Sequence, residues 1–293
     1  MAEVKTSPKD TIAFQGTEGA HADLACRMFY PYFYTHACPT FEDVFDLVSQ
    51  GKVGLGLIPI ENSQAGRVAE IHQILPRMDV HIVGEHFLKV EHHLMAPKGT
   101  KVSDIQTVYS HPQALMQCRE HLRELNLSTQ SYSNTAQAAS DVAKWNDKTK
   151  AALGSRLAAE LYGLEIIKEN MHDADDNFTV FVAIAKEPKE ITADDKHVIS
   201  TVLFTIRNIP SALYKALGGF ATNGVNMIKL ESYIPGGVSS TAQFYITFEG
   251  NPDERNVQRA LEELGFFCKK VQVLGVYPAD PARYAIEQEL PSA

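Results

Sequence analysis

The chain has 293 residues, of which 44% are hydrophobic and 22% charged, a composition typical of globular proteins and a length that fits about two domains. Its formal net charge of −9 argues against nucleic acid and an anionic membrane surface as partners, because both attract lysine and arginine. A local group of hydrogen-bond donors can still hold a small anion. The first residues lack the apolar core of a signal peptide, and no apolar run is long enough to cross a bilayer, so we expect a cytoplasmic protein.

From residue 11 to residue 186, short apolar strands alternate with helical patterns. This alternation predicts mostly parallel α/β sheets, with a site formed by the loops after the strands. The predicted extended segments are 11–16, 53–62, 80–97, 105–111, 150–155 and the apolar run that begins at Thr179 and ends at residue 186. The predicted helices are 18–30, 41–51, 112–125, 135–145 and 156–163. The polar, aperiodic segment 186–196 indicates a linker.

The remainder of the chain has a different pattern of elements, in the order β-α-β-β-α-β. This order is that of the ferredoxin-like arrangement. The strands are predicted at 199–206, 225–234, 241–249 and 269–277, and the helices at 210–224 and 252–265. Pro235–Gly237 indicates a hairpin between the two middle strands. Because helices cover only one face of such a sheet, the other face or the edge strands favour a dimer.

The four cysteines do not form a CxxC pair, and their positions indicate reduced thiols. Known nucleotide-loop, dinucleotide, metalloprotease and serine-hydrolase motifs are absent from the sequence. His92 and His93 are adjacent, which is poor spacing for metal ligands. The sequence therefore predicts a pocket that uses neither a cofactor nor a metal.

Four polar clusters lie at the ends of predicted strands, and we expect them to converge. Short polar side chains together with the amides of helix N-termini can hold an anion. Each cluster alone could equally consist of helix caps, with Glu61 as a cap or ion-pair residue and His111 as a simple hydrogen-bonding residue. The clusters are Gly16–Gly19, Glu61–Ser63 with Gly66 and Arg67, Ser110–Gln113, and Asn177 with Thr179. This pattern alone does not name a reaction.

Three stretches, PIENSQAGRV, YSHPQALMQC and NFTVF, resemble the three blocks of the prephenate dehydratase family. A fourth, PSALYKALGGFATNGVNMIKLESYIPGG, resembles the amino-acid-sensing ACT domain, and the whole chain is similar to the short monofunctional bacterial enzymes. The resemblance implies a two-lobed catalytic domain, like the type 2 periplasmic binding proteins, at residues 10–187. It further implies a linker at 188–197 and a ferredoxin-like ACT domain at 198–280.

The resemblance also implies a function. The substrate would be prephenate and the products phenylpyruvate, carbon dioxide and water, in phenylalanine biosynthesis, without metal or organic cofactor. L-Phenylalanine would act as a feedback effector, and the chain would form a homodimer or homotetramer through the ACT domain. Two alternatives stay open: arogenate as the substrate, and a non-catalytic amino-acid-binding regulator.

In the catalytic domain, the resemblance implies that Thr179 donates a hydrogen bond to the leaving hydroxyl, while its polar neighbours position the substrate. The family's last block usually reads Thr-Arg-Phe, whereas Val180 follows Thr179 here. A substrate carboxylate would then need another cation, for which Arg67 is the first candidate and Arg156 a weaker one. The expected site residues are Glu61, Asn62, Ser63, Arg67, Ser110, His111, Gln113, Asn177, Thr179 and Phe181.

In the C-terminal module, the helix start at Pro210–Leu213 offers amides to the carboxylate of an amino acid. The implied effector residues are Ser211, Ala212, Leu213, Asn223, Asn226, Met227, Glu231 and Ser232. A module that only dimerises, without binding an effector, is the alternative.

Overall fold

The computed structural model describes residues 7–234 and 242–289. Within these residues the chain forms two compact units. Unit 1 comprises residues 7–47, 52–68 and 87–181, and unit 2 comprises 48–51, 69–86 and the described residues after 181. Unit 2 therefore contains a segment from the N-terminal half of the chain in addition to the C-terminal module.

The first sheet of unit 1 begins with three parallel strands that bury apolar side chains such as Phe14 and Leu57. The strand order is β11-β3-β1-β2, and the short strand β4 pairs antiparallel with the end of β3. The strands are β1 (Thr11–Gln15), β2 (Tyr34–Cys38), β3 (Leu55–Asn62), β4 (Gly66–Arg67) and β11 (Phe178–Ala185). The helices of this part of the chain are α1 (His21–Phe29) and α2 (Phe41–Ser49).

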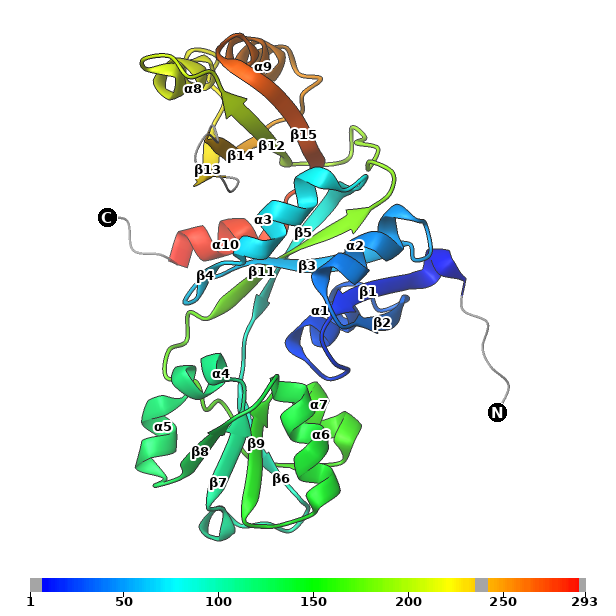
Figure 1. Ribbon diagram of the computed structural model, residues 1–293, viewed down its shortest axis with the longest axis vertical. Coiled ribbons are helices and arrows are strands. Elements are labelled where there is room, and N and C mark those ends of the chain that lie inside the picture. Colours follow the sequence, from blue (N-terminus) through cyan, green and yellow to red (C-terminus); the bar gives the residue numbers. More distant parts are fainter. Residues whose placement is uncertain (1–6, 235–241, 290–293) are drawn as a thin grey trace. The chain divides into compact units, whose positions relative to one another are not determined.

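The second sheet of unit 1 has helices on both faces (Figure 1). Its order is β10-β6-β9-β7-β8, with parallel pairs around β7 and antiparallel pairs around β6. Val108 and Leu122 belong to the apolar core on one face, and Ala139 and Val142 to that on the other. The strands are β6 (His93–Ala96), β7 (Thr107–Ser110), β8 (Ser128–Ser131), β9 (Lys150–Gly154) and β10 (Glu165–Lys168). The helices are α4 (Pro112–Gln117), α5 (Arg119–Glu124), α6 (Thr135–Trp145) and α7 (Arg156–Tyr162).

The predicted helix 112–125 is in fact two helices, α4 and α5, separated by Cys118. The carbonyl of Gln117 accepts a hydrogen bond from the backbone N–H of Asp173 at 2.8 Å. The carboxylate of Asp173 in turn accepts from the backbone N–H of Glu120 at 3.0 Å and of His121 at 3.3 Å. Asp173 thus ends one helix and caps the next, which replaces the helical hydrogen bonds that an unbroken helix would make.

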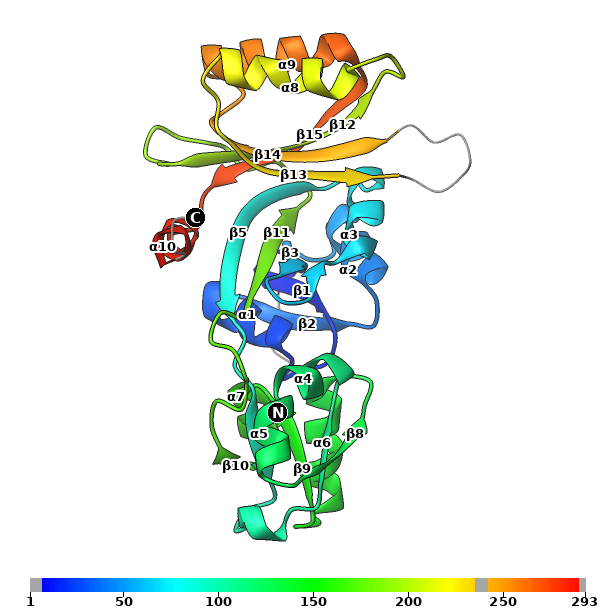
Figure 2. The ribbon, with the colours of Figure 1, turned by 90° about the vertical axis from the view of Figure 1, so that its left-hand side faces the viewer.

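The C-terminal part of unit 2 has the predicted β-α-β-β-α-β order, and its two helices lie on one face of the sheet (Figure 2). The strands pair antiparallel in the order β13-β14-β12-β15. Phe204, Phe220, Phe248 and Leu264 form part of its core. The elements are β12 (Val198–Ile206), α8 (Ala212–Thr222), β13 (Met227–Tyr233), β14 (Gln243–Glu249), α9 (Arg255–Phe267) and β15 (Cys268–Pro278).

One further strand joins this sheet: β5 (His81–Lys89) pairs with β15 through Ile82 and Gly275. A Cβ atom added at Gly275 would lie 2.3 Å from the carbonyl oxygen of Ile82, so only glycine fits there. Unit 2 also contains the short helix α3 (Ala69–Ile74) and α10 (Pro281–Glu289).

Several sequence predictions are corrected by the structure. Helix α1 begins at His21 rather than at residue 18, because Gly16 and Gly19 have positive φ angles and the intervening segment is a turn. Elements β2, β4, β8, β10, α3 and α10 were not predicted. The predicted hairpin at Pro235–Gly237 lies outside the described residues.

Three further features of the structure bear on the sequence analysis. The segment 186–196 contains neither helix nor strand. All four cysteines, Cys26, Cys38, Cys118 and Cys268, are buried free thiols. Within the described residues, no helix is both long and apolar enough to span a membrane.

Candidate functional site

A pocket of about 350 Å³ in unit 1 brings together elements of both sheets. Its size falls within the usual range for small-molecule sites. Five of the predicted site residues line it: Glu61, Asn62, His111, Gln113 and Thr179. The ends of β3 and β11 and the start of α4 therefore meet, as three of the four polar clusters were expected to do. The fourth cluster contributes its neighbour His21.

The side chain of Asn62 organises the end of β3. Its Oδ1 accepts from the backbone N–H groups of Gln64 at 3.1 Å and Ala65 at 2.9 Å. Because both partners are donors, the amide nitrogen must point the other way. Its Nδ2 donates toward Asn177 Oδ1 at 2.8 Å and toward Thr179 Oγ1 at 3.1 Å.

This arrangement orients the hydroxyl of Thr179. The side chain is partly exposed and lines the pocket, and its oxygen already accepts a hydrogen bond from Asn62. The hydroxyl proton is thereby free to point toward a bound molecule. A threonine hydroxyl held in this way can act as a directed hydrogen-bond donor.

Ser63 and Asn177 hold the loops behind this pair and are outside the pocket lining. The hydroxyl of Ser63 donates to the carbonyl of Asp176 at 2.7 Å and accepts from the backbone N–H of Phe178 at 2.9 Å. Asn177 is buried, and its Nδ2 has no hydrogen-bond partner among the described residues. The two side chains connect the end of β3 to the start of β11.

At the other polar cluster, Ser110 is fully buried and donates to the carbonyl of Leu153 at 2.7 Å, so its hydroxyl is occupied by the backbone. His111 is the N-cap of α4, and its Nδ1 accepts from the backbone N–H of Gln113 at 3.2 Å. His111 therefore carries its proton on Nε2 and can serve as a donor in the pocket.

The remaining predicted residues are not among those that line the pocket. Arg67 is exposed and lies opposite Glu61 in the backbone register of β3 and β4, but it is outside the lining. Arg156 lies 2.8 Å from Glu169, and Phe181 is buried in the core.

Sequence reasoning missed two histidines, His21 and His92, that also line the pocket. His21 Nε2 donates to the carbonyl of Glu91 at 3.0 Å, and His92 Nε2 donates to Gln117 Oε1 at 3.0 Å. The two rings are in edge-to-face contact, with centroids 5.0 Å apart. In the sequence, His92 stands out only by its poor metal-ligand spacing with His93, whereas the position of His21 shortly after the Gly16–Gly19 cluster is a signal of the site.

Burial is the main cause of the altered charge on these histidines. Desolvation lowers the pKa of His21 below 6.5 and, with nearby histidines, lowers that of His92 to about 3. Both rings are therefore neutral near pH 7. Among the described residues, no group of three or more histidine, cysteine or acidic side chains is arranged to hold a metal ion.

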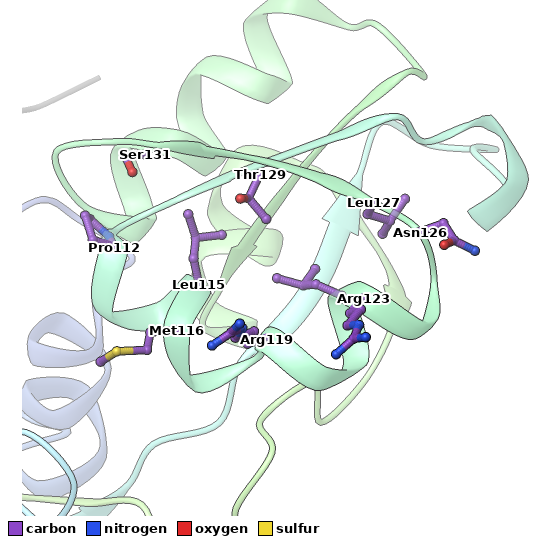
Figure 3. A pocket seen from close by; sticks show the side chains of 10 residues that line it. Pro112, Leu115, Met116, Arg119, Arg123, Asn126, Leu127, Thr129 and Ser131 are labelled. Carbon is purple, nitrogen blue, oxygen red and sulfur yellow. The ribbon is translucent and has the colours of Figure 1, made fainter.

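A second hollow of unit 1, of about 580 Å³, lies beside α4, α5 and β8 (Figure 3). Leu115, Met116 and Leu127 form part of its apolar wall, and Arg119 and Arg123 add positive charge. None of the predicted catalytic residues lines it. The convergence of these residues therefore favours the smaller pocket as the candidate active site.

In unit 2, the predicted effector residues are spread over both ends of α8, the loop that follows it and the edge strand β13. Ser211 is exposed with a φ of +60°, Ala212 is buried and Leu213 packs on the core. Asn223 Nδ2 donates to Glu263 Oε1 at 2.9 Å, and Asn226 Nδ2 to Glu249 Oε2 at 3.0 Å. Met227 and Ser232 are exposed on β13.

Glu231 has the most defined surroundings of this group. Its carboxylate lies 2.9 Å from His72 Nε2 of α3 and 3.1 Å from Lys229 Nζ. The hydrogen bond with His72 is the main reason that the pKa of Glu231 falls to about 2. The ring of His72 also packs edge-to-face on Tyr245, whose hydroxyl donates to the His72 carbonyl at 2.6 Å.

Residues 12–189 match the family model described as prephenate dehydratase. The chain therefore belongs to the prephenate dehydratase family, lyases that dehydrate and decarboxylate prephenate. This match includes every element that lines the pocket.

Two relatives and one solved structure extend the likeness beyond this region. A bifunctional N-acyl-homoserine lactone acylase/prephenate dehydratase of Komagataeibacter europaeus is 44% identical over 272 residues, which cover 93% of this chain and 97% of the relative. Arogenate dehydratase 2 of Petunia hybrida is 34% identical, covering 92% and 72%. The structure of Arthrobacter aurescens prephenate dehydratase in complex with L-Phe has 25% identity and a TM-score of 0.83, covering 92% and 90%.

Proposed function

We propose that the unit 1 pocket converts prephenate into phenylpyruvate, carbon dioxide and water, with Thr179 as hydrogen-bond donor to the departing hydroxyl. The observation that carries this proposal is the Asn62–Thr179 hydrogen bond at 3.1 Å inside the pocket. In this proposal, the two sheets of unit 1 correspond to the two lobes of a type 2 periplasmic-binding-protein-like domain.

The reaction breaks two bonds on opposite sides of the ring. The hydroxyl leaves with the electron pair of its C–O bond, and the electron pair of the C–carboxylate bond enters the ring, which becomes aromatic as carbon dioxide departs. One proton is consumed to convert hydroxide into water. Threonine is a very weak acid, so Thr179 stabilises the departing oxygen by hydrogen bonding. Glu61 lines the same pocket, and its carboxyl group can relay this proton from solvent, while the Nε2–H of His111 can donate a hydrogen bond to the substrate.

The test is to mix the purified chain with prephenate and follow phenylpyruvate formation. We expect turnover by the native chain, and a loss of about 10²- to 10⁴-fold in kcat for Thr179→Ala, the range for a positioned donor. Thr179→Ser keeps the hydroxyl and serves as the matched control. Native-like turnover by Thr179→Ala would refute the role of this hydroxyl, and no turnover by the native chain would favour the non-catalytic regulator.

Arogenate is an alternative substrate, because a relative 34% identical is named an arogenate dehydratase. The two substrates differ only in a keto or an amino group on the side chain. We propose prephenate as the preferred substrate. Comparison of kcat/KM for the two under identical conditions decides between them, and a higher value for arogenate would reverse the assignment.

A second candidate activity is hydrolysis of N-acyl-homoserine lactones, favoured by the relative that is 44% identical and carries this activity in its name. Apolar side chains of Pro59, Val68 and Val90 line part of the pocket, where a short acyl chain would fit. Release of the free amine of homoserine lactone from a hexanoyl substrate tests this activity. Its loss in Thr179→Ala would place both reactions in one pocket.

We further propose that the βαββαβ module is an ACT domain that binds L-phenylalanine as a feedback effector and mediates dimerisation or tetramerisation. Support comes from the relative with L-Phe bound, and from exposed apolar side chains, such as Leu230 and Ile234, at the edge strand β13 and its end. Calorimetry with L-phenylalanine tests effector binding, and the absence of heat at millimolar ligand would refute it. Light scattering after size-exclusion chromatography tests oligomerisation, and a monomer would refute it.

A further inference from the structure

A substrate carboxylate in the pocket needs a nearby group that can carry a positive charge. The described lining contains the carboxyl group of Glu61 and three histidines, His21, His92 and His111, but neither lysine nor arginine. The proposed substrate carries two carboxylates. Burying a carboxylate without a cation or several donors is costly, and the histidines are the lining residues that can become cations.

His111 is unsuited to this task. Its Nδ1 accepts a hydrogen bond from the backbone N–H of Gln113 and caps α4. A proton on Nδ1 would turn this acceptor into a donor and leave the helix start without its cap.

His92 is also unsuited. It is buried, and its Nδ1 has no hydrogen-bond partner among the described residues, so a proton there would lack an acceptor. A positive charge on His92 is further disfavoured by its histidine neighbours, His21, His93 and His172, which lower its pKa.

His21 differs in two respects. It is partly exposed, and its Nε2–H already donates to the carbonyl of Glu91 at 3.0 Å, a bond that stabilises the protonated ring. It is also the first residue of α1, whose N-terminal amides attract an anion. A carboxylate at this position would therefore meet both the ring and the helix start.

We infer that His21 takes up a proton when a carboxylate-bearing substrate enters the pocket and then anchors that carboxylate as an imidazolium. This inference rests on the proposed function, since it names the group that binds the substrate anion at that site. His92 stays neutral and supports the ring of His21 by edge-to-face contact.

The charges around His21 determine the sign of the pH dependence. Burial lowers its pKa below 6.5, His93 lowers it further, and the carboxyl and carbonyl groups of Glu91 raise it. Arg156 and Glu169 act on His93 with opposite signs. In the free protein His21 is neutral at pH 7.5, and a bound carboxylate raises its pKa. The affinity of the pocket for a carboxylate-bearing ligand should therefore decrease as pH rises, by up to about tenfold per pH unit for one linked proton.

The experiment is calorimetry with phenylpyruvate, the stable monocarboxylate product, at pH 7.5 in buffers of different ionisation enthalpy. The dependence of the observed heat on the buffer gives the number of protons taken up on binding. We expect an uptake of at least about 0.5 proton per site for the native chain, as linkage to a single group requires. His21→Gln keeps a donor for the Glu91 carbonyl but cannot be protonated, so its uptake should be close to zero.

The control is His36→Gln, because His36 is an exposed histidine of β2 outside the pocket lining, and this variant should match the native chain. Binding without proton uptake in the native chain, or undiminished uptake in His21→Gln, overturns the inference. So does failure of phenylpyruvate to bind.

Steady-state kinetics with prephenate add a readout that a merely structural role would not change. His21→Gln should raise KM about tenfold, the usual effect of losing one charged contact, while kcat changes less, and the fall in apparent affinity with pH should disappear. Turnover of prephenate by the native chain reports separately on the proposed function. An active enzyme with no proton uptake would refute only the role of His21.

Discussion

Histidine plays opposite roles in the two units. In unit 1, His92 lies among other histidines, and burial followed by their repulsion lowers its pKa to about 3. In unit 2, His72 is equally buried but lies 2.9 Å from the carboxylate of Glu231, whose pKa it lowers to about 2. At His92, desolvation is the largest cause of the low pKa and nearby histidines add to it, whereas His72 has a carboxylate partner within hydrogen-bonding distance.

Among the variants compared here, Asn62→Leu should have the largest effect, and it should change the activity of unit 1 without changing ligand binding by unit 2. This change keeps the side-chain size but removes the donor that orients Thr179. We expect kcat to fall about 100-fold, as for loss of a preorganised donor, with no change in L-phenylalanine binding. Prephenate turnover and calorimetry measure the two quantities.

Gln64→Ala is the matched control, since the side chain of Gln64 is exposed and outside the pocket lining. Its kcat should remain within about twofold of the native value, as for most surface changes. A native-like kcat for Asn62→Leu would show that Thr179 needs no orienting partner.

Glu231→Gln should produce the next largest effect, on the proposed effector site. A carboxylate on β13 offers a charge-assisted bond to the ammonium group of an amino acid, and we expect its removal to weaken L-phenylalanine binding about tenfold. Catalysis without effector should be unchanged. Glu262→Gln, on the exposed side of α9, is the control for the change of net charge. If the native chain and both variants bind L-phenylalanine equally well, the effector binds elsewhere.

The same variant should alter the acid stability of unit 2 by a smaller amount. Because folding lowers the pKa of Glu231 from 4.5 to about 2, its stabilising contribution is present above pH 4.5 and is lost as the pH falls toward 2. In urea unfolding monitored on unit 2, the native chain should exceed Glu231→Gln by about 1 kcal/mol at pH 7. The difference should shrink toward zero near pH 2; a difference that is constant with pH would mean that the carboxylate charge is irrelevant.

Arg67→Ala should have the smallest effect. Arg67 was the sequence-based candidate for the cation that binds a substrate carboxylate, but it lies outside the pocket lining. If His21 supplies the charge, kcat/KM for prephenate should change by less than about threefold, the scale of an exposed ion pair. A loss of activity in Arg67→Ala with native behaviour in His21→Gln would restore the original assignment.

The features that sequence predicted well are those encoded within single elements. The apolar face of α9, with Val257, Ala260 and Leu264, is visible in the helical period and indeed packs in the core. In contrast, β8 has four exposed residues in a row, and without alternation it gave no strand signal. The site follows the same rule. Asn62 ends one apolar strand and Thr179 lies at the start of another, and both were predicted. The contact between His21 and His92 depends instead on tertiary packing.

The amide of Asn62 has two hydrogens but three acceptors within 3.1 Å, namely Asn177 Oδ1, the Phe178 carbonyl and Thr179 Oγ1. At least one of these contacts must share a hydrogen with another. In the proposed reaction, Thr179 gives its own hydrogen bond to the departing hydroxyl, so its oxygen becomes a stronger acceptor and draws the shared hydrogen toward it. In the resting protein, Asn62 has fewer amide hydrogens than acceptors around it. Its hydrogen bond to Thr179 can therefore strengthen while the C–O bond of the substrate breaks.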